Sequence, residues 1–172
     1  MQIEKELVGK IQTDYLFLVG KLELDAKYFI DKIKEGTQNS KNNYLTNVVG
    51  LMTDWRYFCS DKQFIKTIYP VLDKLDKYKF LRDYELELAW GLAEGFGGRT
   101  KEHNHTPSVI SGVLYLNDHD QDLIFPDINE KVKPEEGKIV IFSSELKHKC
   151  DRNTMDKVKY AIAFNFNQTF QY

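Results

Sequence analysis

The chain has 172 residues, 42% hydrophobic and 13% aromatic, a composition typical of one folded globular domain. Its 24 basic and 26 acidic residues give a formal charge of −2, which excludes the strongly basic composition typical of nucleic-acid or anionic-lipid binding. The longest apolar runs fall far short of the ~20 residues that span a bilayer.

The N-terminus and the cysteines indicate an intracellular protein. Residues 1–6 lack the basic segment followed by an apolar one that marks a signal peptide. Two cysteines, Cys59 and Cys150, are too few for a disulfide framework, and free thiols suit a reducing compartment. We therefore expect a cytoplasmic location, with no membrane or nucleic-acid partner.

The first half of the chain mixes strand and helix signals. Residues 15–20 form an aromatic and aliphatic run that ends in Gly20 and predicts a strand. Residues 26–34 carry apolar residues at helical spacing and predict a helix, with Gly36 as its stop. Asp61 is the predicted N-cap of a longer helix, whose apolar stripe we interpret as core packing: Phe64, Ile65, Ile68, Leu72 and Leu75. Pro70 interrupts that stripe and predicts a kink or a boundary.

The second half is rich in strand signals. Short apolar or alternating runs separated by turn residues predict strands at 86–90, 109–116, 122–125, 139–142 and 160–166. The acidic stretch 118–122 reads as a hairpin turn with His119 exposed to solvent. Short strands after a helical start predict an α+β fold, namely a double-stranded β-helix (jelly roll) with supporting N-terminal helices. We expect one domain over 1–172, with 1–85 as the support region and 86–172 as the jelly-roll core.

Three histidines are the candidate metal ligands. His103 and His105 are two residues apart, so on a strand they would point to the same face, and His148 follows 43 residues after His105. Imidazole is the commonest protein metal ligand, and three of them can form one face of an iron site that leaves other positions open. The alternative is that all three are surface histidines, because their sequence neighbours are polar.

The run around these histidines resembles a known enzyme family. Segment 105–116, HTPSVISGVLYL, resembles the signature of a family of 2-oxoglutarate/Fe(II)-dependent oxygenases, in which a His precedes an S-G-V-x-Y-L strand. Matches elsewhere keep the family's order: Trp90 upstream, then LIFP at 123–126, PEEGKIVIF at 134–142, His148, and KYAIAFN at 159–165. The run is also similar to prolyl hydroxylases. The resemblance covers about 90–166.

The resemblance implies a set of site residues, with two departures from the pattern. The superfamily's usual first motif is H-x-D, whereas this chain has H-N-H. Either His103, His105 and His148 are all ligands, or the third position belongs to water or to a carboxylate such as Asp127. The family's Arg, which pairs with the distal carboxylate of 2-oxoglutarate, is replaced by Lys159. A lysine offers a flexible point charge rather than a bidentate fork.

Further pocket residues follow from the same resemblance. Tyr115 is expected to contact the co-substrate through its hydroxyl. Lys157 is an alternative to Lys159, and Ser111 and Asn165 are additional candidates for the pocket.

The implied activity is that of a hydroxylase-type dioxygenase. It would use Fe(II), O2 and 2-oxoglutarate, release succinate and CO2, and oxidise a protein or small-molecule substrate that the sequence does not identify. Two alternatives are a non-catalytic jelly roll, such as a binding or virion-associated protein, and a three-His cupin-like dioxygenase that does not use 2-oxoglutarate.

Overall fold

The computed structural model of the chain describes residues 14–38, 46–75 and 84–168. Residues 1–6, on which the signal-peptide prediction depends, lie outside these ranges. The elements are, in chain order, β1 (Phe17–Lys21), α1 (Ala26–Gln38), β2 (Val48–Val49), β3 (Leu51–Met52), α2 (Lys62–Leu75), β4 (Tyr84–Glu94), β5 (Arg99–His103), β6 (Ile110–Tyr115), β7 (Leu123–Phe125), the 3-10 helix η1 (Pro126–Ile128), β8 (Glu130–Val132), β9 (Lys138–Ser143), β10 (His148–Cys150) and β11 (Lys159–Gln168).

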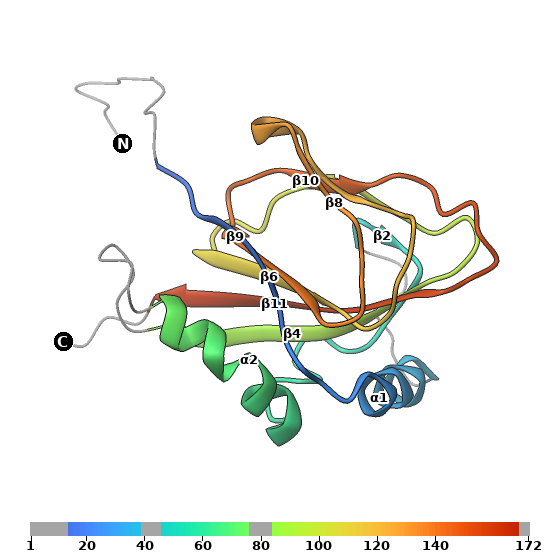
Figure 1. The fold of residues 1–172 in the computed structure, drawn as a ribbon, viewed down its shortest axis with the longest axis horizontal. Coiled ribbons are helices and arrows are strands. Elements are labelled where there is room, and N and C mark those ends of the chain that lie inside the picture. The colour runs from blue at the N-terminus through green and yellow to red at the C-terminus, as the bar shows by residue number, and fades with distance from the viewer. Residues whose placement is uncertain (1–13, 39–45, 76–83, 169–172) are drawn as a thin grey trace, which may run out of the picture.

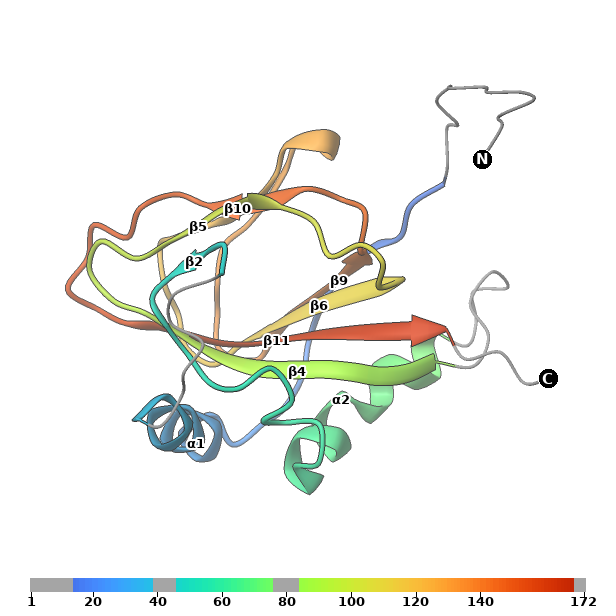
Figure 2. The same ribbon diagram turned by 180° about the vertical axis from the view of Figure 1, so that it is seen from behind.

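The strands form two sheets that face each other (Figure 1). The six-stranded sheet has the order β1-β9-β6-β11-β4-β3, the five-stranded sheet has the order β2-β5-β10-β7-β8, and neighbouring strands are antiparallel. Figure 2 shows β2, β5 and β10 on one side of the molecule, the larger sheet opposite, and both helices beyond that sheet. The predicted α+β jelly roll with supporting helices is confirmed.

The central strands β9, β6 and β11 of the larger sheet are buried on both faces, which explains their near-continuous apolar runs. Side chains alternate between the two faces of a strand. On β11, Ile162 and Phe164 pack into the core that the helices cover. Their neighbour Ala163 packs with Trp90 into a second core between the sheets. The same alternation directs Lys159, at the start of β11, into the space between the sheets.

Helix α1 runs past the glycine predicted to stop it. The helix ends at Gln38, two residues beyond Gly36, so that prediction is wrong. A Cβ atom placed on Gly36 would lie 2.8 Å from side-chain atoms of both Thr53 and Tyr57. The glycine therefore allows the helix to pack closely against the loop between β3 and α2.

Helix α2 begins where the sequence predicts. The Asp61 Oδ1 atom accepts a hydrogen bond of 2.9 Å from the Phe64 backbone N–H, so the N-cap is confirmed. Pro70 lies inside the helix and does not end it. The buried stripe is Phe64, Ile68, Val71 and Leu75, whereas the predicted member Ile65 is 41% exposed; the side chain of Leu72 is not described.

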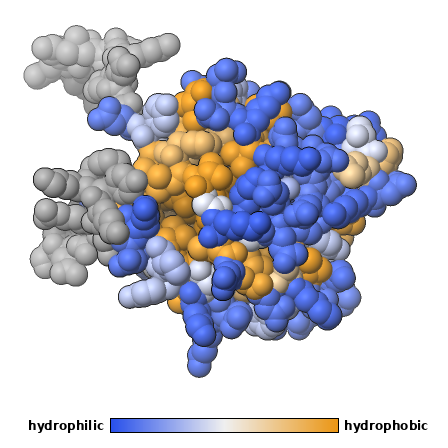
Figure 3. Space-filling model, in the orientation of Figure 1, coloured by the Kyte–Doolittle hydropathy of each residue, from blue (hydrophilic) through white to orange (hydrophobic). Residues whose placement is uncertain are grey.

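On the face shown in Figure 3, hydrophilic residues surround an apolar area near β1 and α2. That area contains a groove lined by Leu18, Val19, Pro70, Val71, Ile139 and Ile141. None of the helices described is both long enough and apolar enough to cross a membrane.

Candidate metal centre

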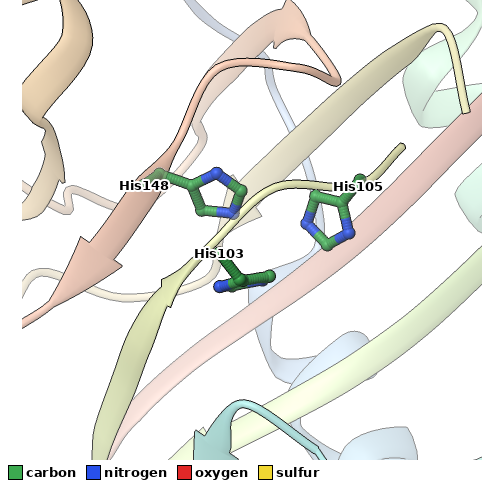
Figure 4. Close-up of side chains that lie close together, drawn as sticks. All are labelled: His103, His105 and His148. Atoms are coloured by element: carbon green, nitrogen blue, oxygen red, sulfur yellow. The ribbon is translucent and has the colours of Figure 1, made fainter. Parts of the chain in front are cut away.

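Three imidazole rings meet at one end of the space between the sheets (Figure 4). His103 ends β5 and is paired across the sheet with His148, which begins β10. One ligand nitrogen of each of His103, His105 and His148 lies within 4.8 Å of those of the other two. The ring centroids of His103 and His148 are 4.4 Å apart, and that of His105 lies 4.9 and 5.0 Å from them.

His105 reaches the cluster by a different route from the one predicted. Their spacing predicts that His103 and His105 lie on one strand, but β5 ends at His103. The His105 backbone N–H instead donates a 2.8 Å hydrogen bond to the Ser144 carbonyl oxygen. Ser144 lies just beyond β9, so this bond ties the loop after β5 to the segment leading to His148.

Backbone carbonyl groups fix two of the three rings. Nδ1 of His103 lies 2.8 Å from the Lys101 carbonyl oxygen, and Nδ1 of His148 lies 3.1 Å from that of Leu146. A carbonyl oxygen only accepts, so Nδ1 carries the proton in both rings and Nε2 keeps its lone pair. Metal-bound histidines usually have this second contact. The ring of His105 has no hydrogen bond to any residue that the structure describes.

The cluster is held in the neutral form that a metal needs. Burial and the two neighbouring histidines lower the pKa of His105 to about 3. Burial, with a smaller effect of His103, lowers the pKa of His148 to about 4, and burial lowers that of His103. All three rings are therefore unprotonated near neutral pH.

The donor set fits a transition-metal ion such as Fe(II). Imidazole nitrogen suits iron, and three ligands on one side leave open positions for other molecules. Within the described ranges no carboxylate belongs to the cluster. The carboxylate considered as a third ligand, Asp127, is exposed and accepts a 2.9 Å hydrogen bond from the Lys147 backbone N–H instead.

A cavity of about 50 Å³ extends from the histidines between the sheets. Both predicted co-substrate residues, Lys159 and Tyr115, line it together with the three histidines. Burial raises the pKa of Tyr115 well above its usual value, so its hydroxyl is a neutral hydrogen-bond donor. Trp90 lines the same cavity, and its buried indole N–H has no acceptor among the described residues. A ligand oxygen would satisfy this donor.

Lys159 is not free, because it forms an ion pair with the Glu94 carboxylate, which no sequence motif indicates. Its Nζ lies 2.6 Å from Glu94 Oε2 and donates a 3.3 Å hydrogen bond to the sulfur of Cys150. Glu94 in turn accepts a 2.9 Å hydrogen bond from the Thr100 hydroxyl. The donor set at the histidine end fits iron, whereas the lysine end offers no unpaired cation for a second carboxylate.

The remaining candidates lie elsewhere. Ser111 and Asn165 hydrogen-bond to each other at 2.9 Å and do not line the cavity. Lys157 lines a different surface pocket. The prediction that His119 is exposed is wrong: its side chain is 3% exposed. Both ring nitrogens are satisfied in the interior, because Nε2 lies 3.0 Å from the Lys157 carbonyl oxygen and Nδ1 accepts from a backbone N–H.

No protein-family model and no curated protein sequence matches the chain. Solved structures, in contrast, do match the chain. The viral collagen prolyl hydroxylase vCPH from Paramecium bursaria Chlorella virus-1, in its 2-oxoglutarate complex, aligns with a TM-score of 0.70 and 14% identity over 89% of this chain and 96% of its own. A prolyl-4-hydroxylase from Pseudomonas putida aligns with a TM-score of 0.65 and 16% identity, covering 90% and 93%.

The chain has the fold of the 2-oxoglutarate/Fe(II) oxygenases. HygX from Streptomyces hygroscopicus, with nickel and 2-oxoglutarate bound, aligns with a TM-score of 0.68 and 11% identity over 90% of this chain and 83% of its own. HygX has also been solved with hygromycin B bound. Proteins of this fold therefore include one named as a collagen prolyl hydroxylase and one solved with hygromycin B bound.

Proposed function

We propose that the chain is a non-haem Fe(II) oxygenase that uses O2 and a 2-oxo acid co-substrate. Its expected reaction is the hydroxylation of a protein or small-molecule substrate. The observation that carries the proposal is the cluster of His103, His105 and His148 at the mouth of a cavity between the two sheets. The sequence resemblance indicates 2-oxoglutarate as the co-substrate.

The histidines, Tyr115 and Trp90 have definite roles in this function. The three histidines bind Fe(II) through neutral nitrogen atoms, and the backbone contacts of His103 and His148 hold two rings in place. The bound iron supplies the redox chemistry between O2, the oxo acid and the substrate. Tyr115 and the indole N–H of Trp90 donate hydrogen bonds to oxygen atoms of the co-substrate, and the apolar walls limit access of water.

An anaerobic Fe(II) titration tests the proposal. We expect the protein to bind Fe(II), and addition of a 2-oxo acid to produce the visible metal-to-ligand charge-transfer band. Iron binding without a band for any 2-oxo acid would instead support a three-His dioxygenase of another kind. Absence of iron binding would contradict the proposal and favour a non-catalytic jelly roll.

Trp90→Phe tests the indole donor separately from the metal. The change removes the N–H and keeps an aromatic ring beside His105 and Trp55. We expect Fe(II) affinity to stay unchanged and 2-oxo acid affinity to fall roughly tenfold, the range of one hydrogen bond to a charged group. Titration of the visible band measures both. Trp55→Phe is the matched control, because Trp55 does not line the cavity; an equal loss in both variants would contradict this role for Trp90.

A further inference from the structure

The lysine at the inner end of the cavity already has a carboxylate partner within the chain. Lys159 is the only Lys or Arg among the described residues that line the cavity. The Lys159 and Glu94 side chains are 3% and 1% exposed, and their charged atoms are 2.6 Å apart. The two residues lie directly opposite each other in the β11–β4 pairing. Strand register therefore brings them together.

Glu94 is also fixed on its other sides. The Thr100 hydroxyl, from the smaller sheet, donates to Oε1 while Lys159 occupies Oε2. The backbones of Gly50 and Gly98 pack against the Glu94 side chain, and a Cβ on either glycine would lie 3.2 Å from it. Displacement of the carboxylate from Lys159 would break the hydrogen bond from Thr100 and disturb this packing.

The charges at this end of the cavity cancel. Burial alone would lower the pKa of Lys159, but contacts with Cys150 and Glu94 outweigh it and the pKa is raised. Glu94, whose Oε2 lies 2.6 Å from the Lys159 Nζ, is the anion that balances the lysine.

We propose, on the basis of the oxygenase function, that Glu94 takes the place of the co-substrate's second carboxylate at Lys159, so that the cavity binds a 2-oxo acid with one carboxylate in preference to 2-oxoglutarate. A second carboxylate reaching Lys159 would meet Glu94 in a buried site, where repulsion between like charges is strong.

The rest of the cavity agrees with a ligand whose far end is uncharged. Beyond the polar residues already described, its walls are apolar, formed by Val48, Leu92, Val113, Leu123, Ala161 and Ala163. With three neutral histidine ligands, Fe(II) keeps its full charge, and a single carboxylate beside the keto group provides an anion at the metal.

The test compares two co-substrates that share a five-carbon chain. 2-Oxopentanoate differs from 2-oxoglutarate in lacking the terminal carboxylate. Each is titrated anaerobically into the Fe(II)-loaded protein, and the visible band and calorimetry give the Kd. We expect the wild-type protein to bind 2-oxopentanoate about tenfold tighter or more. Glu94→Gln frees the lysine charge and should reverse the order, with 2-oxoglutarate binding at least about tenfold tighter than to wild type.

A second variant separates charge from packing. Thr100→Val removes the hydroxyl that holds Glu94 and keeps both charges, so we expect it to retain the preference for 2-oxopentanoate. Thermal unfolding checks that each variant folds. If Glu94→Gln does not fold, the wild-type comparison decides alone.

The outcomes distinguish the two proposals. A wild-type protein that binds 2-oxoglutarate as tightly as 2-oxopentanoate, or more tightly, overturns the role of Glu94 and leaves the oxygenase function intact. A Glu94→Gln variant that folds but does not gain affinity for 2-oxoglutarate does the same. Failure of the wild-type protein to bind iron, or of both oxo acids to produce the band, overturns the oxygenase function and the role of Glu94 with it.

Discussion

We expect His105→Ala and His148→Ala each to abolish measurable Fe(II) binding. Both rings belong to the cluster whose ligand nitrogens lie within 4.8 Å of one another. Removing a metal ligand should cost more than the roughly 10–100-fold in affinity that follows loss of an outer-shell partner. Anaerobic calorimetry with Fe(II) measures the effect, and thermal unfolding shows whether the variant is folded.

The fourth histidine of the chain supplies the control. His119 is buried and hydrogen-bonded but does not line the cavity. His119→Gln should therefore lower stability while leaving iron affinity unchanged. If either His105→Ala or His148→Ala binds iron like the wild type, that residue is not a ligand.

His103→Ala addresses the third coordination position. The structure places His103 at the strand end opposite His148, with Nδ1 donating to the Lys101 carbonyl oxygen and Nε2 left free. We expect a loss of iron affinity comparable to that of the other two variants. A folded variant that keeps its iron would mean that water, or a group outside the cluster, fills this position.

The fold could be predicted from the sequence because local signals and tertiary structure agree over most of the chain. Alternating and continuous apolar runs mark the long strands β4, β6, β9 and β11. The short strands of the smaller sheet gave weaker signals: β5 is the polar sequence RTKEH, and β10 has three residues. These segments are strands because they pair with neighbouring strands that are distant in sequence. A local sequence pattern does not reveal such pairing.

Only part of the candidate site could be predicted from the sequence. The three histidines stand out by residue type and spacing, and the resemblance adds Lys159 and Tyr115. Glu94 ends an ordinary strand and lies 65 residues from Lys159, so only the β11–β4 register relates the two. A carboxylate in a strand is usually solvent-exposed. Its burial next to a buried lysine is therefore information that only the three-dimensional structure contains.

His119 and Gly36 show why the same residue types mislead elsewhere. The acidic neighbours of His119 suggest an exposed turn, yet a backbone carbonyl and a backbone N–H satisfy its ring in the interior. Gly36 has the sequence appearance of a helix stop, yet close contact with Thr53 and Tyr57 explains it. In both cases residues distant in sequence decide the outcome.

The ion pair of Lys159 and Glu94 should also contribute strongly to the stability of the protein at the inner end of the cavity. Lys159→Met leaves the Glu94 carboxylate buried with no cation, because the pair is almost completely inaccessible to solvent. Breaking a buried pair by removing one partner typically costs about 3–5 kcal/mol. We expect a decrease of that size in the free energy of unfolding, measured by urea denaturation of the metal-free protein.

Replacing both charges at once should be far less damaging. In the double variant Lys159→Met, Glu94→Gln, neither residue carries a charge, and the amide still has the Thr100 hydroxyl as a partner. Because the two side chains are in direct contact, their effects should not add, and the double variant should be more stable than Lys159→Met alone. Additive losses would mean that the two charges act independently, which would also remove the basis for Glu94 as the internal partner of the lysine.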